Sequence, residues 1–205
     1  MLGLPKATEI SQQLPKKTIF AKFGLKPAQR EHFDDDISRM LIVNAISPTT
    51  IPTLRKGSEV ECIYVVEVML KKPDYDPKNF LLLCELIPQR MVFALRYADQ
   101  LQLAISHTKL IMGRWQNLEA VSLQLQGIDL DEVWDNLVIA IGEIGIEDDH
   151  SLEEQIAIDE AKRKLLKEIE QLEKKARNEK QPRKKLELFE ELRDKQREFL
   201  KSFQK

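Results

Sequence analysis

The chain has 205 residues, with 32 Lys or Arg against 34 Asp or Glu and a formal net charge of −2 at pH 7. This balance excludes a protein that binds nucleic acid through bulk positive charge. No apolar stretch approaches the ~20 residues of a membrane-spanning helix, and the first residues lack the apolar core of a signal peptide, so a cytoplasmic location is expected.

The first half of the chain predicts two helices followed by two strands. A short helix is expected within residues 7–13, where Pro15 would end it. A second helix begins in the segment Lys26–Phe33, because Pro27 suits the first turn of a helix. The apolar segments 37–46 and 59–70 are rich in β-branched residues and predict strands.

The next elements predict a helix, a hairpin and a further helix. The apolar run 80–87, which ends before a proline, is helical. Residues 91–96 and 101–110 form two strands joined by a tight turn. Asp129 occupies an N-cap position for a helix over 130–141. The order β-β-α-β-β-α predicts an α+β domain with a mixed or antiparallel sheet and flanking helices.

The composition changes sharply near residue 150. Of the last 55 residues, 29 are charged, one is Pro and none is Gly, whereas the first 150 contain 37 charged residues. Ser151 with Glu154 forms a capping box at the start of a long helix. We therefore expect two parts, an α+β domain over 1–146 and a charged helical hairpin arm over 147–205.

Apolar residues in the arm recur with a heptad-like spacing on two helical segments. The first set is Ile158, Leu165, Ile169, Leu172 and Ala176. The second is Phe189, Leu192, Phe199 and Phe203, with Gln196 at one expected core position. The polar break over 178–182 contains a proline, which predicts an antiparallel, coiled-coil-like hairpin rather than one long rod.

These apolar residues are the predicted protein-binding site of the arm. The residues expected to bind a partner, or to pair with each other across the hairpin, are Leu165, Ile169, Leu172, Phe189, Leu192 and Phe199. The partner would be a larger protein or a second copy of the chain.

A basic cluster marks the tip of the hairpin. Its members are Lys174, Lys175, Arg177, Lys180, Arg183, Lys184 and Lys185, with Glu179 as the single acidic residue among them. Such a cluster can bind phosphates in a salt-dependent way, or it can be a solvated turn. The cluster contains no aromatic residue, so base stacking is not indicated. The segment Lys16–Lys26 also alternates cations with aromatics and belongs to the same nucleic-acid hypothesis.

Catalytic and cofactor motifs are weak throughout. Glu61, Glu67 and Lys71, with an acidic residue from the run 34–36, are the only set that resembles a metal-dependent nuclease, and their spacing does not match the Asp…Glu-x-Lys pattern. The three histidines are scattered, and both cysteines lie in apolar runs that predict buried thiols. No phosphate-binding glycine loop is present. We expect no cofactor and no metal site.

Several short motifs resemble a bacterial family classed as a domain of unknown function. They are Gly3-Leu4-Pro5-Lys6, Leu14-Pro15-Lys16-Lys17, Leu25-Lys26-Pro27-Ala28-Gln29-Arg30, Asp36-Ile37-Ser38-Arg39, Ile87-Pro88-Gln89, His107-Thr108-Lys109 and Leu125-Gln126-Gly127. The resemblance covers nearly the whole chain and brings no established activity. It implies a gene neighbourhood of DNA helicases and methyltransferases of restriction-type loci.

Together these observations predict a non-enzymatic accessory or scaffold subunit of a DNA-processing or phage-defence assembly. It would dock through its helical arm onto a helicase or methyltransferase partner, or onto its own copy. The alternatives are a nucleic-acid-binding module that uses the basic tip, and a divergent metal-dependent nuclease.

Overall fold

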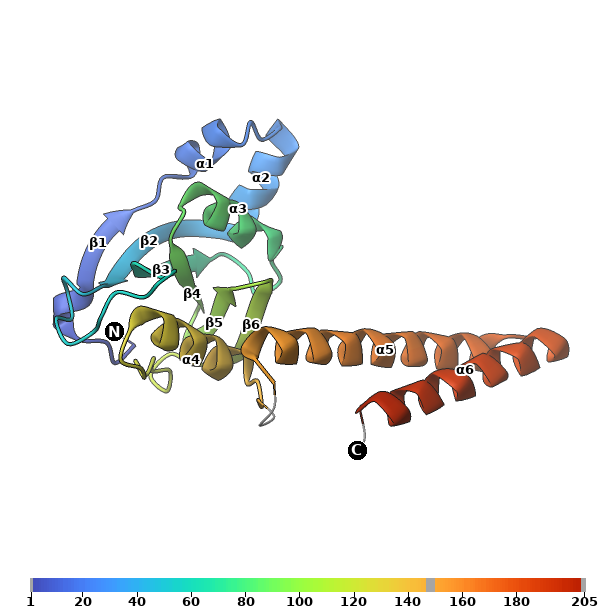
Figure 1. Cartoon of the computed structure of the whole chain (residues 1–205). Helices are drawn as coiled ribbons and strands as arrows, with labels where there is room; N and C mark the ends of the chain where they lie inside the picture. The colour runs from blue at the N-terminus through green and yellow to red at the C-terminus, as the bar shows by residue number, and fades with distance from the viewer. Residues whose placement is uncertain (1, 147–149, 204–205) are drawn as a thin grey trace. The chain divides into compact units, whose positions relative to one another are not determined.

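The computed structural model describes residues 2–146 and 150–203 (Figure 1). The chain divides into two compact units, Met1–Ile144, which we call the sheet unit, and Gly145–Lys205, which we call the arm. The predicted α+β class is confirmed. Residues 147–149, at the predicted start of the arm, lie outside the described residues. Within the described ranges, no helix is both long and apolar enough to cross a membrane.

The sheet unit is built on one six-stranded mixed sheet whose strand order follows the chain. The strands are β1 (Glu9–Gln13), β2 (Ile37–Ile46), β3 (Ile63–Leu70), β4 (Arg90–Tyr97), β5 (Gln100–Ser106) and β6 (Leu110–Asn117). All neighbours are antiparallel except β3 and β4, which run parallel and are joined through helix α3. A parallel pair requires such a crossover, because a tight turn cannot return the chain to the same end.

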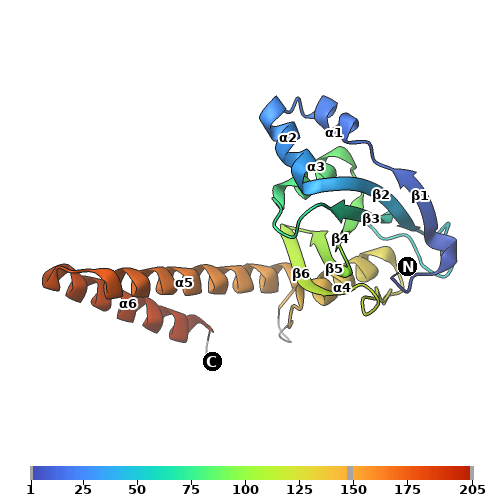
Figure 2. The ribbon, with the colours of Figure 1, turned by 180° about the vertical axis from the view of Figure 1, so that it is seen from behind.

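Three helices cover one face of the sheet, as Figure 2 shows from behind. They are α1 (Lys16–Lys22), α2 (Pro27–Asp36) and α3 (Lys78–Leu86), and a 3₁₀ turn over Lys6–Thr8 precedes β1. Phe33 of α2 and Phe80 of α3 are fully buried against the strands, where they meet Val66, Val68 and Phe93. Burial of a side chain of this size contributes about 1.5–3 kcal/mol, so this layer is the main core of the unit.

The opposite face carries helix α4 (Leu130–Gly142), which packs on β5 and β6. Its buried stripe includes Trp134, Leu137 and Val138. Gly113 on β6 allows a close approach, because a Cβ at that position would lie 3.1 Å from the carbonyl oxygen of Ile141. The predicted N-cap is confirmed, since the Asp129 side chain accepts a hydrogen bond from the N–H of Glu132.

Three predictions about the strands were wrong. Residues 9–13 form the edge strand β1 instead of a helix, because they pair with β2. The strand predicted from residue 59 begins only at Ile63. The strand predicted over 101–110 ends at Ser106, and β6, which the sequence analysis missed, follows after a short turn.

Two lysines of the basic and aromatic segment Lys16–Lys26 make contacts within the sheet unit. Lys16 forms an ion pair with Asp34 at 2.6 Å and also donates to a backbone carbonyl at the start of β2. Lys22 donates to the carbonyls of Glu85 and Leu86 at the end of α3, where a cation suits the helix dipole. This assigns both lysines to folding contacts.

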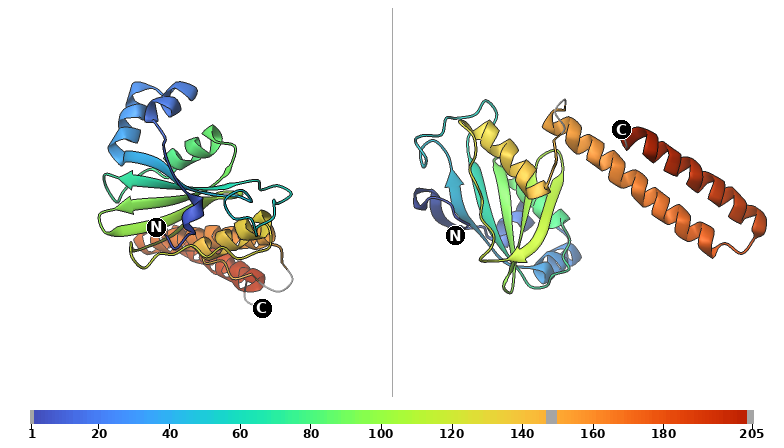
Figure 3. Two further views of the ribbon diagram at one scale, coloured as in Figure 1. Left: turned by 90° about the vertical axis from the view of Figure 1, so that its left-hand side faces the viewer. Right: turned by 90° about the horizontal axis from the view of Figure 1, so that it is seen from below.

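The arm consists of two long helices that pack against each other, as the right-hand view of Figure 3 shows. They are α5 (Leu152–Asn178) and α6 (Pro182–Phe203). The capping box at Ser151 is confirmed by two hydrogen bonds, from the N–H of Glu154 to the Ser151 hydroxyl and from the N–H of Ser151 to the Glu154 carboxylate. The chain turns at the predicted break before Pro182.

Candidate functional site

The two helices of the arm meet along a narrow seam. On α5 the seam includes Leu165 and Ala176, which are buried, and on α6 its centre is Leu192. Lys195 lies opposite Glu168 and forms an ion pair with it at 3.2 Å. Residue pairs whose numbers add to about 363 therefore lie side by side across the hairpin. Steps of three and four along each helix place these residues on one stripe per helix.

One flank of the seam is apolar and exposed, and we call it the apolar flank. Leu166 is 41% exposed, Leu186 62%, Phe189 41% and Leu200 50%. Leu166 follows the seam residue Leu165 by one position, and Phe189 precedes the seam residue Leu192 by three. At 100° per residue in two antiparallel helices, both offsets turn the side chains toward the same side of the hairpin.

The other flank of the seam is polar. It carries Ala161, Glu168 and Glu198, and Lys195 bridges the two glutamates. An exposed leucine is ordinary on a protein surface, but four large apolar side chains on one flank of a hairpin are a coherent patch. Because only one flank is apolar, covering the apolar flank would remove more apolar area from water than covering the polar flank.

The six residues predicted to bind a partner fall into two groups. Leu165 and Leu192 are buried, and Ile169, Leu172 and Phe199 are half-buried in or beside the seam. Phe189 is turned outward, because Leu188 and not Phe189 occupies the seam of α6. Five of the six residues therefore hold the hairpin together, and sequence reasoning missed three of the four members of the apolar flank.

The basic tip joins the ends of the two helices. Arg177 pairs with Glu173 and Arg183 with Glu187, each within one helical turn. The carboxylate of Glu179 accepts hydrogen bonds from the N–H groups of Gln181 and Lys180, which lower its pKa. The other predicted cations have no ion-pair partner among the described residues: Lys174, Lys175, Lys180, Lys184 and Lys185. The tip thus keeps a net positive charge.

The sheet unit contains a polar pocket of about 350 Å³ between the starts of β3 and β4 and the end of β5. Its lining includes Glu59, Glu61, Cys84, Arg90 and His107. None of these residues was predicted to form a site together, because they come from separate segments of the chain.

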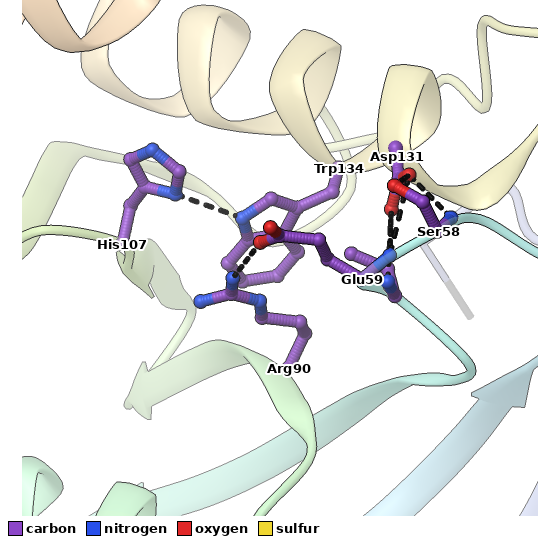
Figure 4. A network of polar contacts seen from close by, with 7 residues as sticks. Ser58, Glu59, Arg90, His107, Asp131 and Trp134 are labelled. Atoms are coloured by element: carbon purple, nitrogen blue, oxygen red, sulfur yellow. Dashed lines mark hydrogen bonds and ion pairs between the residues drawn. The ribbon is translucent and has the colours of Figure 1, made fainter.

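Asp131, in the first turn of α4, fixes one wall of this pocket (Figure 4). Its carboxylate accepts hydrogen bonds from the N–H of Ser58 at 2.6 Å, the hydroxyl of Ser58 at 2.7 Å and the N–H of Val60 at 2.8 Å. The hydroxyl bond and the backbone N–H groups lower the pKa of Asp131. Gly57 is needed beside it, because a Cβ there would lie 2.2 Å from a carboxylate oxygen.

Trp134, one turn further along α4, holds the opposite wall (Figure 4). Its indole N–H donates to Nδ1 of His107 at 3.0 Å, so that nitrogen carries no proton. The guanidinium of Arg90 lies over the Trp134 ring, 5.4 Å from its centre, and is 3.8 Å from the carboxylate of Glu59. Burial raises the pKa of the Cys84 thiol, which disfavours the thiolate that a nucleophile needs. The pocket can bind a polar group, and its cysteine is not activated.

A family model described as "Domain of unknown function (DUF4391)" matches residues 2–199. The chain belongs to this family. No curated protein and no solved structure matches it. The family match confirms the resemblance of the short motifs and adds no chemistry to them. The function of this DUF4391 chain must therefore be argued from its own residues.

The carboxylates proposed for a nuclease centre are not brought together in this DUF4391 chain. Glu61 and Glu67 are six residues apart, which in extended chain is about 20 Å. Glu67 is instead paired with Arg96 at 3.8 Å. Within residues 2–146 and 150–203, no group of three or more His, Cys, Asp or Glu is placed to hold a metal ion.

Asp36, the one fully buried carboxylate of the acidic run, has a structural role that the sequence analysis missed. It accepts hydrogen bonds from the N–H of Asp76 and the side-chain amide of Asn79, and Lys72 lies 2.8 Å from its other oxygen. Burial opposes ionisation, but these partners outweigh it and lower the pKa of Asp36. The carboxylate ties the loop before α3, and the start of α3, to the end of α2.

Proposed function

We propose that this protein is a non-enzymatic accessory subunit that docks through the apolar flank of its helical arm. The observation that carries the proposal is the asymmetry of the hairpin, with four exposed apolar side chains on one flank and ion pairs on the other. A two-helix hairpin cannot enclose a second stripe of apolar residues, and contact with another protein surface would remove this stripe from water.

The proposed setting is a cytoplasmic DNA-processing or phage-defence assembly of the restriction type. The resemblance of the short motifs supports this setting through its implied neighbourhood of helicases and methyltransferases. The partner would then be a larger protein of one of those classes, or a second copy of the chain. The sheet unit would serve as the folded platform from which the arm acts.

A pull-down of the tagged full chain from its native cell tests the docking role. We expect a co-purifying protein, identified by mass spectrometry, to be lost when Leu186 and Phe189 are both changed to Asp. The matched control is Glu191→Arg, an exposed position beside the seam on the polar flank. Circular dichroism establishes that each variant keeps its helices. Equal capture by the wild type and the double variant would contradict docking through the apolar flank.

The unpaired lysines at the hairpin tip favour a second candidate, binding of nucleic acid through its phosphates. Each lysine that contacts a phosphate contributes about one unit to the slope of log affinity against log salt. Lys184→Glu together with Lys185→Glu should weaken binding to duplexes of unrelated sequence equally. The measurement is fluorescence anisotropy over a salt titration. Affinity that does not change with salt would refute this candidate.

A further inference from the structure

We propose that the polar pocket of the sheet unit binds the carboxylate group of a small organic acid through Arg90. All residues of this site belong to the sheet unit, so the site is independent of the docking role of the arm. Two features of the pocket support it. Arg90 has hydrogen-bond donors without acceptors, and Glu59 places a carboxylate near them without bonding to them.

The guanidinium of Arg90 is held in place, yet it makes no hydrogen bond. It lies over the ring of Trp134, 5.4 Å from the ring centre, and Trp134 is buried and bonded to His107. The Arg90 side chain is only 35% exposed. None of its side-chain N–H groups donates a hydrogen bond among the described residues. An anion that enters the pocket therefore gains charge-assisted hydrogen bonds from a guanidinium whose position is already fixed.

Glu59 shows that a carboxylate can approach this guanidinium (Figure 4). Its oxygen is 3.8 Å from a terminal nitrogen of Arg90, which is too long for a hydrogen bond. The backbone N–H of Glu59 is bonded to Asp131 at 3.2 Å, whereas its side chain is 79% exposed. An exposed ion pair of this kind contributes little, so the side chain can turn to water at low cost. Glu59 is thus an internal competitor that the carboxylate of a ligand replaces.

The charges of the lining favour a ligand group with a single negative charge. The lining contains Glu59, Glu61 and Arg90, and Glu61 is paired with Lys56. When the Glu59 side chain turns away, the positive charge of Arg90 is left to be matched. A carboxylate matches this charge, and its two oxygens fit the planar fork of a guanidinium. A phosphate monoester carries about −1.5 to −2 charges at pH 7, so part of its charge would stay unmatched.

The rest of the lining indicates the size and character of the ligand. The volume of about 350 Å³ is near the lower end for ligand pockets, so the acid is small. The side-chain amide of Gln89, which makes no hydrogen bond among the described residues, can donate to or accept from a polar group of the ligand. Ile87 and Met91 add apolar contacts. The pocket therefore suits a short organic acid that carries a further polar group.

Titration of the full chain with sodium acetate, at an ionic strength kept constant with sodium chloride, tests the site. The readout is the NMR resonance of the Trp134 indole N–H, because its ring lies against the guanidinium of Arg90. Trp115, which packs against Tyr75 in the other layer, is the internal reference. We expect a saturable shift of the Trp134 resonance alone, with a Kd in the millimolar range for so small a probe. A shift without saturation, or an equal shift of both tryptophans, would overturn the proposal.

Two substitutions should change the affinity in opposite directions. Arg90→Gln removes the charge-assisted bonds and should raise the acetate Kd at least about 10-fold. Glu59→Gln removes the internal competitor and should lower the Kd roughly 2- to 5-fold. Glu119→Gln, the same charge change at an exposed position outside the lining, should leave the Kd unchanged. An unchanged Kd in Arg90→Gln, or a Kd that is not lower in Glu59→Gln, contradicts the assignment.

Two controls complete the experiment. Arg90→Gln also removes packing on Trp134, so its amide spectrum is compared with that of the wild type before titration. Glu59→Gln changes an exposed side chain, and its expected gain in affinity tests the site even if Arg90→Gln does not fold. Inorganic phosphate is then titrated in the same way at neutral pH. A phosphate Kd above that of acetate supports the carboxylate, and a lower one overturns it.

Discussion

Replacement of Asp131 by Ala should destabilise the sheet unit by removing the anchor of one wall of the polar pocket. The carboxylate accepts three short hydrogen bonds from Ser58 and Val60, which lie more than seventy residues earlier in the chain. No other side chain joins these N–H groups to α4 among the described residues. The loss should therefore loosen the loop as well as lower the free energy of unfolding.

The expected magnitude follows from the number of bonds and their exposure. A net value of about 1 kcal/mol for each of three bonds gives about 3 kcal/mol, and access of water to this surface loop reduces the loss to about 2 kcal/mol. For a unit of this size, about 2 kcal/mol corresponds to a Tm lower by about 6–8 °C. Glu119→Ala, which removes an exposed carboxylate without a partner among the described residues, is the matched control.

Urea unfolding followed by tryptophan fluorescence provides the assay. Both tryptophans belong to the sheet unit, so the signal does not include the arm. Because the pKa of Asp131 is below its ordinary value of 3.8, the ionised form stabilises the folded state above that pH, and this stabilisation is lost as pH falls further. The difference between wild type and Asp131→Asn should therefore shrink below about pH 4. A difference that is constant between neutral and acidic pH would refute the reasoning.

Two further changes test the packing of the sheet. Gly113→Ala would place a methyl group 3.1 Å from the carbonyl oxygen of Ile141 and 3.2 Å from that of Leu103. The free energy of unfolding, measured by urea titration, should therefore fall by about 1–3 kcal/mol. A neutral effect would show that α4 can move away. Burial raises the pKa of Tyr75 to about 12 from an ordinary 10.0, so its contribution to stability is complete below pH 10 and is lost as pH rises toward 12. An ultraviolet titration should show a late-ionising tyrosine that is absent in Tyr75→Phe.

The sequence predicted those elements whose pattern is strong along the chain. Strand β2 was predicted with its observed bounds, and α4 and α5 began at the predicted caps. Strand β1 was missed because it is short, mostly exposed and polar, so only its pairing with β2 defines it. Strand β6 was missed because its glycine and arginine interrupt the apolar pattern.

The candidate sites were harder to predict, for two physical reasons. Along α6, both Leu188 and Phe189 fit a helical apolar stripe, and only the position of α5 decides which one faces the seam. Lys185 and Lys195 are half-buried, which their hydropathy does not indicate. Asp131 looks like an ordinary acidic residue of a first helical turn, and nothing local identifies its distant loop partners.

The strand order of the sheet has a consequence for how the protein is made. Each strand after β1 pairs with the strand that precedes it in the chain, so no strand has to insert between two others. During synthesis on the ribosome, every new strand emerges when its neighbour is already available, and loop-closure distances stay short. The last strand, β6, is followed in the chain by α4, which packs on β5 and β6, so this face of the sheet is covered soon after it forms.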